Sequence, residues 1–401
     1  MAVLFHIAYR EAVFVKKSLF AASVAACALA LSLAGCAQAP APTTTTTVPP
    51  AASATSEAPP AATSTSEAPP AATTSAADFY ACMVSDQGGF DDKSFNETSF
   101  KGVTDAKAAL GIQERHVQSA TADDYSKNIQ SMVEAKCDII IGVGFNLEAA
   151  VTAAAKANPD IDFAIVDSAP SEVLPNAKGL LFNTNESSFL AGYLAAGITQ
   201  TGKVATYAGM AIPSVTIFMD GYALGVQYYN QQKGTNVQVL GWDPANPDQG
   251  ATVQSQSPFT DVNAGKILAD NQVSQGADVL FPVAGNAGTG ALQTAQNSNG
   301  KVSAIWVDTD GCISAAQFCS VMPTSVYKGM DVAVQAVITD TFNGQFSNQS
   351  YIGTLANEGT GISPFHDWDT NPLITAELRA ELETIRQGII AGTIDAGSGS
   401  V

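Results

Sequence analysis

Arginine and histidine are scarce in this chain of 401 residues, which holds four arginines and three histidines. Arg10, Arg379 and Arg386 lie toward the ends of the sequence, so Arg115 is the only arginine in its body. Arginine is the side chain that most often holds carboxylate and phosphate groups through paired hydrogen bonds. Its scarcity therefore argues against an anionic ligand.

The few histidines exclude the common zinc sites. His6, His116 and His366 are scattered, and none has the spacing from a cysteine or a carboxylate that zinc-binding motifs have. We therefore expect no bound metal.

Catalytic motifs are missing as well. No Gly-x-Ser-x-Gly segment, which is typical of hydrolases, occurs in the sequence. "AGNAGTG" (284–290) lacks the Gly-Lys-Ser/Thr ending of a phosphate loop, so we interpret it as a packed turn. Asp91 and Asp92 are paired carboxylates that can serve acid–base chemistry. However, Asp92 followed by Lys93 and Ser94 is more typical of a helix start. We expect no cofactor and no enzyme activity.

Acidic residues dominate what is present. The chain carries 37 Asp and Glu against 18 Lys and Arg, which gives a net charge of -19. Such a surface repels nucleic acid and anionic lipid, so neither is expected as a partner.

The N-terminus has the pattern of a targeting segment. Lys16 and Lys17 precede an apolar run that is short for a membrane-spanning helix and ends in "LAGC" (33–36). "LAGC" resembles the bacterial lipobox, which implies that 1–35 is a lipoprotein signal peptide and that Cys36 carries a lipid. An ordinary secretory signal is the alternative. We expect the protein to be anchored by lipid on the outer face of the cell membrane.

Residues 36–77 have the composition of a disordered tether. The ten-residue unit "TSEAPPAATS" (55–64) is followed by the near-identical "TSEAPPAATT" (65–74). Pro, Ala, Thr and Ser with almost no large apolar side chains cannot build a core. The folded part is therefore predicted to be 78–401.

Four cysteines remain in that folded part. Cys312 and Cys319 are close enough in sequence to form a small disulfide loop in an oxidising compartment. Cys82 and Cys137 fall in predicted strands, where they form either buried thiols or a second bridge.

From residue 78 onward, apolar strand-like runs alternate with helical stretches. Alternation of this kind is typical of α/β folds with parallel, doubly wound sheets. Residues 135–168 and 274–309 have the same layout, each ending in a strand that closes with Val-Asp. We therefore predict two Rossmann-like lobes joined by a hinge. The first lobe is expected at about 78–201 and 311–342, and the second at about 202–310 and 343–401.

Ligands of open α/β sheets bind at the carboxyl ends of the strands. Asp86, Gly144, Asp167, Gly285 and Asp308 all fall at such ends. We therefore expect them to meet in a cleft between the lobes.

Two aromatic residues accompany these positions. Phe95 and Phe259 each follow a strand in a polar neighbourhood, one in each lobe. They either fill the core or stack on a flat ligand from both sides. Lys328 is expected to donate to a ligand hydroxyl or to balance the carboxylates. Carboxylates beside aromatic rings favour a neutral, flat ligand that bears a sugar.

The sequence resembles the basic membrane protein (BMP) family of ABC-transporter substrate-binding lipoproteins, and it is similar to the purine nucleoside receptor among them. The resemblance covers about Asp78 to Phe365. It rests on "DQGGFDDKSFNETSFKGV", "FAIVDS", "SFLAGYLAA", "WVDTDG", "TSVYKGMD" and "YIGTLANEGTGISPF".

The resemblance implies a type I periplasmic-binding-protein fold with three hinge strands, a purine nucleoside ligand and no catalysis. By motif, Phe95 and Phe259 stack on the base and Asp167 reads its edge. The ribose contacts fall on Asp86, Gly285, Asp308 and Lys328, with Asp310 competing for the place of Asp308. The implied partners are a permease and an ATPase, and the protein is expected to be a monomer. A simple-sugar receptor on the same fold and a surface sensor without transport are the alternatives.

Overall fold

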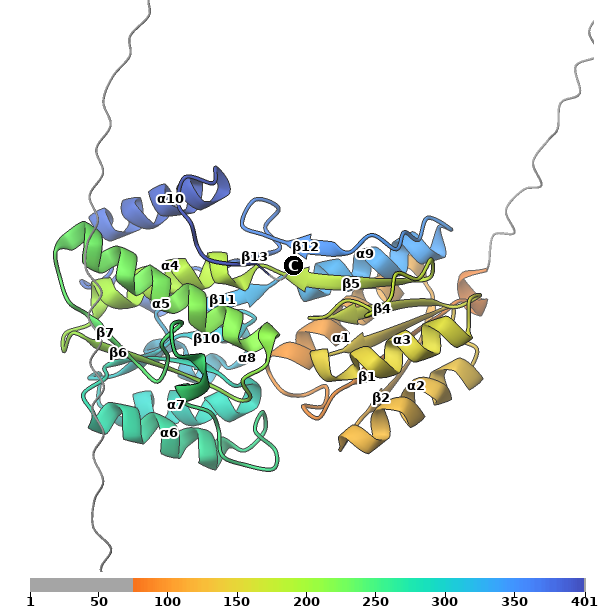
Figure 1. Cartoon of the computed structure of the whole chain (residues 1–401), viewed down its shortest axis with the longest axis horizontal. Coiled ribbons are helices and arrows are strands. Elements are labelled where there is room, and N and C mark those ends of the chain that lie inside the picture. The colour runs from red at the N-terminus through yellow and green to blue at the C-terminus, as the bar shows by residue number, and fades with distance from the viewer. Residues whose placement is uncertain (1–74, 400–401) are drawn as a thin grey trace, which may run out of the picture. The chain divides into compact units, whose positions relative to one another are not determined.

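The structure is a computed structural model that describes residues 75–399 (Figure 1). Among these residues, no helix combines the length and the apolar character needed to cross a bilayer. The predicted signal peptide, Cys36 and nearly all of the predicted tether lie outside the described residues.

The first lobe is built on a sheet of six parallel strands in the order β12-β5-β4-β3-β1-β2. Its strands are β1 (Tyr80–Ser85), β2 (Gln113–Gln118), β3 (Ile139–Val143), β4 (Asp162–Val166), β5 (Ala177–Phe182) and β12 (Tyr351–Gly353). The central strand β3 is buried along its whole length because helices cover both faces of a parallel sheet. α1 (Phe95–Leu110) and α9 (Met330–Phe342) pack on one face, while α2 (Tyr125–Glu134) and α3 (Glu148–Ala157) pack on the other.

The second lobe contains a four-stranded sheet, β7-β6-β8-β9, and a three-stranded sheet, β10-β11-β13. Its strands are β6 (Lys203–Ala208), β7 (Gln238–Leu240), β8 (Val279–Val283), β9 (Ser303–Ala304), β10 (Trp306–Asp308), β11 (Ser325–Lys328) and β13 (Thr360–Ile362). One core is formed with α4 (Thr184–Ile198), α5 (Pro213–Lys233) and α10 (Ala376–Ile390). The other is formed with α6 (Val262–Ser274), α7 (Thr289–Asn297) and the segment around α8 (Gly311–Ser314).

The chain passes between the lobes three times. The passages follow β5, follow β11, and join β12 to β13. The backbone N–H of Asn183 donates to the carbonyl of Gly353 at 2.8 Å, and that of Gly329 donates to Gly359 at 2.9 Å. The three passages therefore lie side by side, as a three-strand hinge requires.

The predicted α/β fold is confirmed, but the predicted lobe boundaries are wrong. α4, which was assigned to the first lobe, packs against α5 in the second. Residues 311–328 also belong to the second lobe, whereas β12 completes the sheet of the first. The chain crosses to the other lobe directly after β5 and after β11. The alternation of strands and helices in the sequence does not indicate on which sheet a helix packs, so it could not predict these crossings.

Both pairs of cysteines form disulfides. Cys312–Cys319 is bridged as predicted, and Cys82–Cys137 is a bridge rather than two buried thiols. The second bridge ties β1 to the segment that enters β3, toward the amino end of β3 and away from the carboxyl strand ends that carry the site described below.

Candidate ligand-binding site

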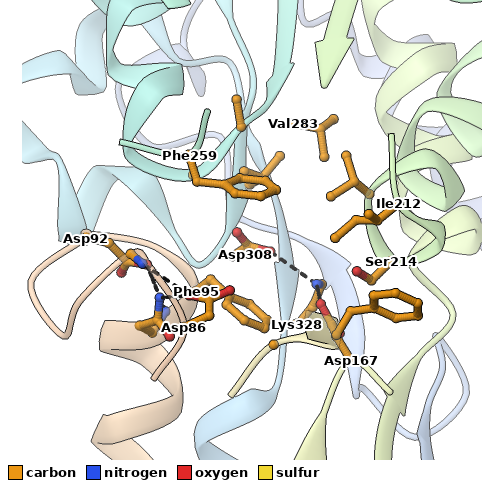
Figure 2. Close-up of a pocket in the computed structure, with 18 of the residues that line it drawn as sticks. Asp86, Asp92, Phe95, Asp167, Ile212, Ser214, Phe259, Val283, Asp308 and Lys328 are labelled. Atoms are coloured by element: carbon orange, nitrogen blue, oxygen red, sulfur yellow. Dashed lines mark hydrogen bonds and ion pairs between the residues drawn. The ribbon is translucent and has the colours of Figure 1, made fainter. Parts of the chain in front are cut away.

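A pocket lies between the two lobes, at the carboxyl ends of their strands (Figure 2). All seven residues predicted from the sequence to bind a ligand line it, together with Gly144 at the end of β3. They are Asp86, Phe95, Asp167, Phe259, Gly285, Asp308 and Lys328. The structure thus brings the predicted set together in one place, and their contact with a ligand stays a prediction.

Asp86 is fixed in the turn that follows β1. Its Oδ1 accepts hydrogen bonds from the backbone N–H of Gly88 at 3.2 Å and from the amide of Asn96 at 3.0 Å. Burial raises the pKa of Asp86 above its ordinary value, against the lowering effect of these two donors. Gly144 has a φ of 112°, and a Cβ there would lie 2.5 Å from the Asp86 carboxylate. The strand end therefore needs a glycine for Asp86 to lie against it.

Asp92 begins helix α1. Its carboxylate accepts from the backbone N–H groups of Ser94, Asn96 and Glu97 at 2.9–3.0 Å. The helix-start interpretation of Asp92 is confirmed, but the Ser94 side chain makes no capping hydrogen bond. Burial raises the pKa of Asp92 to about 7, although the three donors act to lower it.

This raised pKa predicts a pH effect on stability. The folded state holds the Asp92 proton more tightly than the unfolded chain. The contribution of Asp92 to stability is thus full below its ordinary pKa of 3.8 and is lost as the pH rises toward about 7. Asp92→Asn keeps an acceptor oxygen for the helix start but does not titrate. Denaturant unfolding should show a fall in stability across this pH range that is smaller in the variant than in the wild type.

Asp261→Asn is the matched control. Asp261 caps α6 by accepting from the backbone N–H of Ala264 at 3.0 Å, and hydrogen bonds lower its pKa. The contribution of Asp261 to stability is therefore lost only at pH values below its ordinary pKa. Between about pH 4 and pH 7, the stability of Asp261→Asn should fall by as much as that of the wild type. If the stability of Asp92→Asn falls across this pH range by as much as that of the wild type, Asp92 does not titrate in it.

Phe95 and Phe259 reach the pocket from different lobes (Figure 2). Phe95 is the first residue of α1, and Phe259 precedes α6. Both rings are partly buried and pack at the edge of a lobe core. A Cβ at Gly209, just after β6, would lie 2.5 Å from the ring of Phe259. The glycine thus leaves room for that ring beside the end of β6.

Lys328 is the buried cation of the pocket. Its Nζ pairs with the carboxylate of Asp167 and lies 3.4 Å from Oδ1 of Asp308. The three side chains are 3–9% exposed. Burial alone would lower the pKa of Lys328, but the two carboxylates raise it above its ordinary value. Burial raises the pKa of Asp167 to about 6 against the effect of Lys328, so the pair is charged at neutral pH.

The same ammonium group lies between two aromatic rings. Its Nζ is 4.9 Å from the ring centroid of Phe95 and 4.9 Å from that of Phe218. The other oxygen of Asp308 accepts from Ser94 Oγ of the first lobe at 2.7 Å. The charged groups therefore connect the lobes directly.

Asp167 and Asp308 occupy equivalent places in the two lobes. They follow or end β4 and β10, and their φ angles are 63° and 71°. A left-handed backbone is uncommon outside glycine and is often found at functional sites. Asp310 does not line the pocket; it caps α8 and lies 2.6 Å from His366 Nε2. Of the two competing aspartates, Asp308 is thus the one in the pocket.

Other lining residues were not singled out from the sequence as ligand contacts. They include Asn96, Phe145, Ile212, Ser214, Phe218 and Val283. Pro213, directly after Ile212, is typical of the first residue of a helix. It is the sequence signal from which the part of the pocket wall formed by α5 can be predicted. Outside the pocket, Asp310, Cys312 and His366 lie close together, but Cys312 is bridged to Cys319 and offers no thiolate.

This chain is similar to known proteins. A family model described as "ABC transporter substrate-binding protein PnrA-like" matches residues 79–398. A "CD4+ T-cell-stimulating antigen" of Listeria innocua is 30% identical over 80% of this chain and 88% of that protein. An "ABC transporter nucleoside-binding protein BmpA" of Lactococcus lactis is 32% identical over 58% of this chain and 64% of that protein.

A solved structure has the same architecture. An ABC transporter solute-binding protein of Aeropyrum pernix matches with a TM-score of 0.68 and 25% identity, over 79% of this chain and 92% of that one. The two lobes therefore form the type I fold of periplasmic solute-binding proteins, as the sequence predicted.

Proposed function

The chain belongs to the family of PnrA-like ABC transporter substrate-binding proteins, and we propose that it captures a purine nucleoside between its lobes for import. Its family is one of binding proteins rather than enzymes. The observation that carries the proposal is the pocket itself, which combines the rings of Phe95 from one lobe and Phe259 from the other with carboxylates at the strand ends. Aromatic rings stack on the faces of a base, and carboxylates accept from ring N–H groups and ribose hydroxyls.

The charge of the pocket favours a nucleoside over a nucleotide. Its single lysine, Lys328, already contacts two of the four aspartates that line it, which are Asp86, Asp92, Asp167 and Asp308. A phosphate group would bring further negative charge next to side chains that are largely buried, where like charges repel strongly. A neutral ligand meets no such repulsion.

We expect guanosine, inosine or adenosine to bind at least about tenfold more tightly than the matching monophosphate, which corresponds to about 1.4 kcal/mol. Isothermal titration calorimetry on residues 75–401 measures both. A thermal-shift panel of nucleosides, free bases, simple sugars and amino acids precedes it and identifies the ligand class. Equal or tighter binding of the monophosphate, or a response to sugars alone, would contradict the proposal.

The N-terminal sequence supports a location on the outer face of the cell membrane. "LAGC" (33–36) and the Pro-, Ala-, Thr- and Ser-rich segment after it fit a lipid anchor on Cys36 followed by a tether. The protein would act as a monomer that passes its ligand to the permease of an importer, with the energy supplied by the ATPase.

Cys36→Ala is expected to release the protein from membranes. In the full-length chain the lipid would be attached to this thiol, so its loss should move most of the protein to the soluble fraction. Fractionation after salt and carbonate washes, with immunoblotting, makes the measurement. Cys27→Ala, which lies inside the predicted signal peptide, is the control and should stay in the membrane fraction. A Cys36→Ala protein that stays membrane-bound after these washes would rule out the lipid anchor.

A further inference from the structure

A second cavity adjoins the pocket and has no role in the proposed function. Its volume is about 350 Å³, and it shares Phe145, Asp167 and Ser214 with the first pocket. Figure 2 shows Ser214 and Asp167 on the same side of the first pocket. The remaining walls are the residues that follow β4, the end of β5, the first two turns of α5 and residues 398–399. The second cavity thus continues the space beyond Asp167, away from the two phenylalanines.

Polar groups without partners face this cavity. Among the described residues, no hydrogen bond is made by the side-chain hydroxyls of Ser214 and Thr216, which both lie at the start of α5. Asp220 stands one turn further along the same helix face, and one of its oxygens accepts from Trp242 Nε1 at 2.9 Å. Donors and acceptors that are not used by the protein are available to a ligand.

Apolar side chains also line the cavity. Leu181 and Ile217 are each 8% exposed and line it together with Phe182. Residues 398–399 form part of the wall, where the backbone carbonyl of the preceding Gly397 accepts from the Asn185 amide at 3.0 Å. Apolar side chains together with free hydroxyls suit a substituent with an apolar body.

We propose that this cavity is a subsite for a substituent on the base edge of the bound purine nucleoside, so that the ligand class includes nucleosides modified at position 6 of the purine. The inference rests on the proposed function, because it requires the base to lie between Phe95 and Phe259 with its edge toward Asp167. Asp167 lines both spaces, so a group attached to that edge enters the second cavity. The subsite disfavours an anionic group, since Asp167 and Asp220 are its only charged lining residues among those described.

The test compares two matched pairs of ligands by calorimetry: adenosine with N6-benzyladenosine, and guanosine with O6-benzylguanosine. For the wild type, the benzyl compound of at least one pair should bind within about tenfold of its parent, since the cavity has room for the ring. Adenosine with a benzyl ether on the ribose 5′ oxygen should bind at least about a hundredfold more weakly than adenosine.

Thr216→Tyr fills the second cavity without touching the first. It should weaken the tolerated benzyl compound by at least about tenfold and leave the parent nucleoside within about twofold. Gln227→Tyr places the same side chain at an exposed position of the same helix and should change neither affinity.

Three results would overturn the inference. Rejection of both position-6 compounds by more than about a hundredfold, with the parents bound, would show that the cavity is no subsite. Tolerance of the 5′ ether together with that rejection would show that the ribose, not the base edge, faces the cavity. If Thr216→Tyr and the wild type bind the tolerated benzyl compound equally well, the benzyl ring does not lie in the second cavity. If none of the parent nucleosides binds, the proposed function itself fails.

Discussion

Lys328→Met is expected to lower the free energy of unfolding by about 3–5 kcal/mol at about pH 8, the usual cost of removing one partner from a buried ion pair. Met has a similar length and keeps most of the packing of the lysine stem. The variant leaves the carboxylates of Asp167 and Asp308 buried without a cation. Urea unfolding followed by circular dichroism measures the loss.

The loss should depend on pH in a defined direction. Asp167 already has a pKa of about 6 beside Lys328 because of burial, and removing the positive charge raises it further. As the pH falls below that value the carboxyl group becomes neutral and its unpaired burial costs less. The difference between Lys328→Met and the wild type should therefore shrink between about pH 8 and pH 5.

Lys156→Met is the control for this experiment. Lys156 pairs with Glu172 at 2.7 Å, but both side chains are more than half exposed, and such surface pairs contribute about 1 kcal/mol or less. If Lys328→Met lowers the free energy of unfolding by no more than Lys156→Met does, and if this loss does not change with pH, the buried aspartates do not need the charge of Lys328. Small-angle scattering on the variant would reveal lobes that open to hydrate the carboxylates, which would also contradict the expected loss.

The sequence predicted most of the strands because a parallel sheet with two covered faces needs continuous apolar runs. β3 and β8 are buried throughout, and they lie in the segments 135–168 and 274–309, whose shared layout predicts a strand in each. β2 was not predicted, because "QERHVQ" lies at the sheet edge, where half of its residues face solvent and no apolar run is needed. β5 was not predicted either, since its residues 177–182 run almost directly into the apolar helix α4.

The site was predictable where strand ends determine it. Asp86, Asp167 and Asp308 follow or end strands, and the carboxyl ends of parallel strands meet at one edge whatever the details of packing. Phe218 could not be found in this way. It is 1% exposed and lies within α5, so its pattern is that of any core residue, and only the packing of α5 turns it toward Lys328. Asn96 has the same difficulty, because its position depends on how Asp92 starts α1.

The sequence left open whether Phe95 and Phe259 fill the core or stack on a ligand, and their positions in the structure are compatible with both roles. Each ring lines the pocket and also packs at the edge of a lobe core. Removing either should therefore cost some stability, but less than the roughly 3–5 kcal/mol lost when a fully buried phenylalanine is truncated. The effect on ligand affinity separates a stacking ring from a core ring.

Removing both rings should have the larger effect on binding. Stacking on a base contributes roughly 1–3 kcal/mol per aromatic contact, so Phe95→Ala and Phe259→Ala should each weaken nucleoside affinity by about ten- to a hundredfold. The rings are expected to touch opposite faces of the base and not each other, so their contributions should add. The double variant should lose about 2–6 kcal/mol of binding free energy. Calorimetry on the two single variants and the double variant measures this sum directly.

Phe100→Ala is the matched control, because it lies on the same helix as Phe95 and does not line the pocket. Its ring packs against Phe90 and His116, with centroids 4.9 and 4.5 Å away. Its loss should lower the melting temperature by an amount similar to that of Phe95→Ala and leave nucleoside affinity within about twofold. If Phe95→Ala and Phe259→Ala behave like Phe100→Ala, both rings belong only to the lobe cores. If one of them alone weakens binding, the base stacks on a single lobe, and stacking cannot be what holds the two lobes together around the ligand.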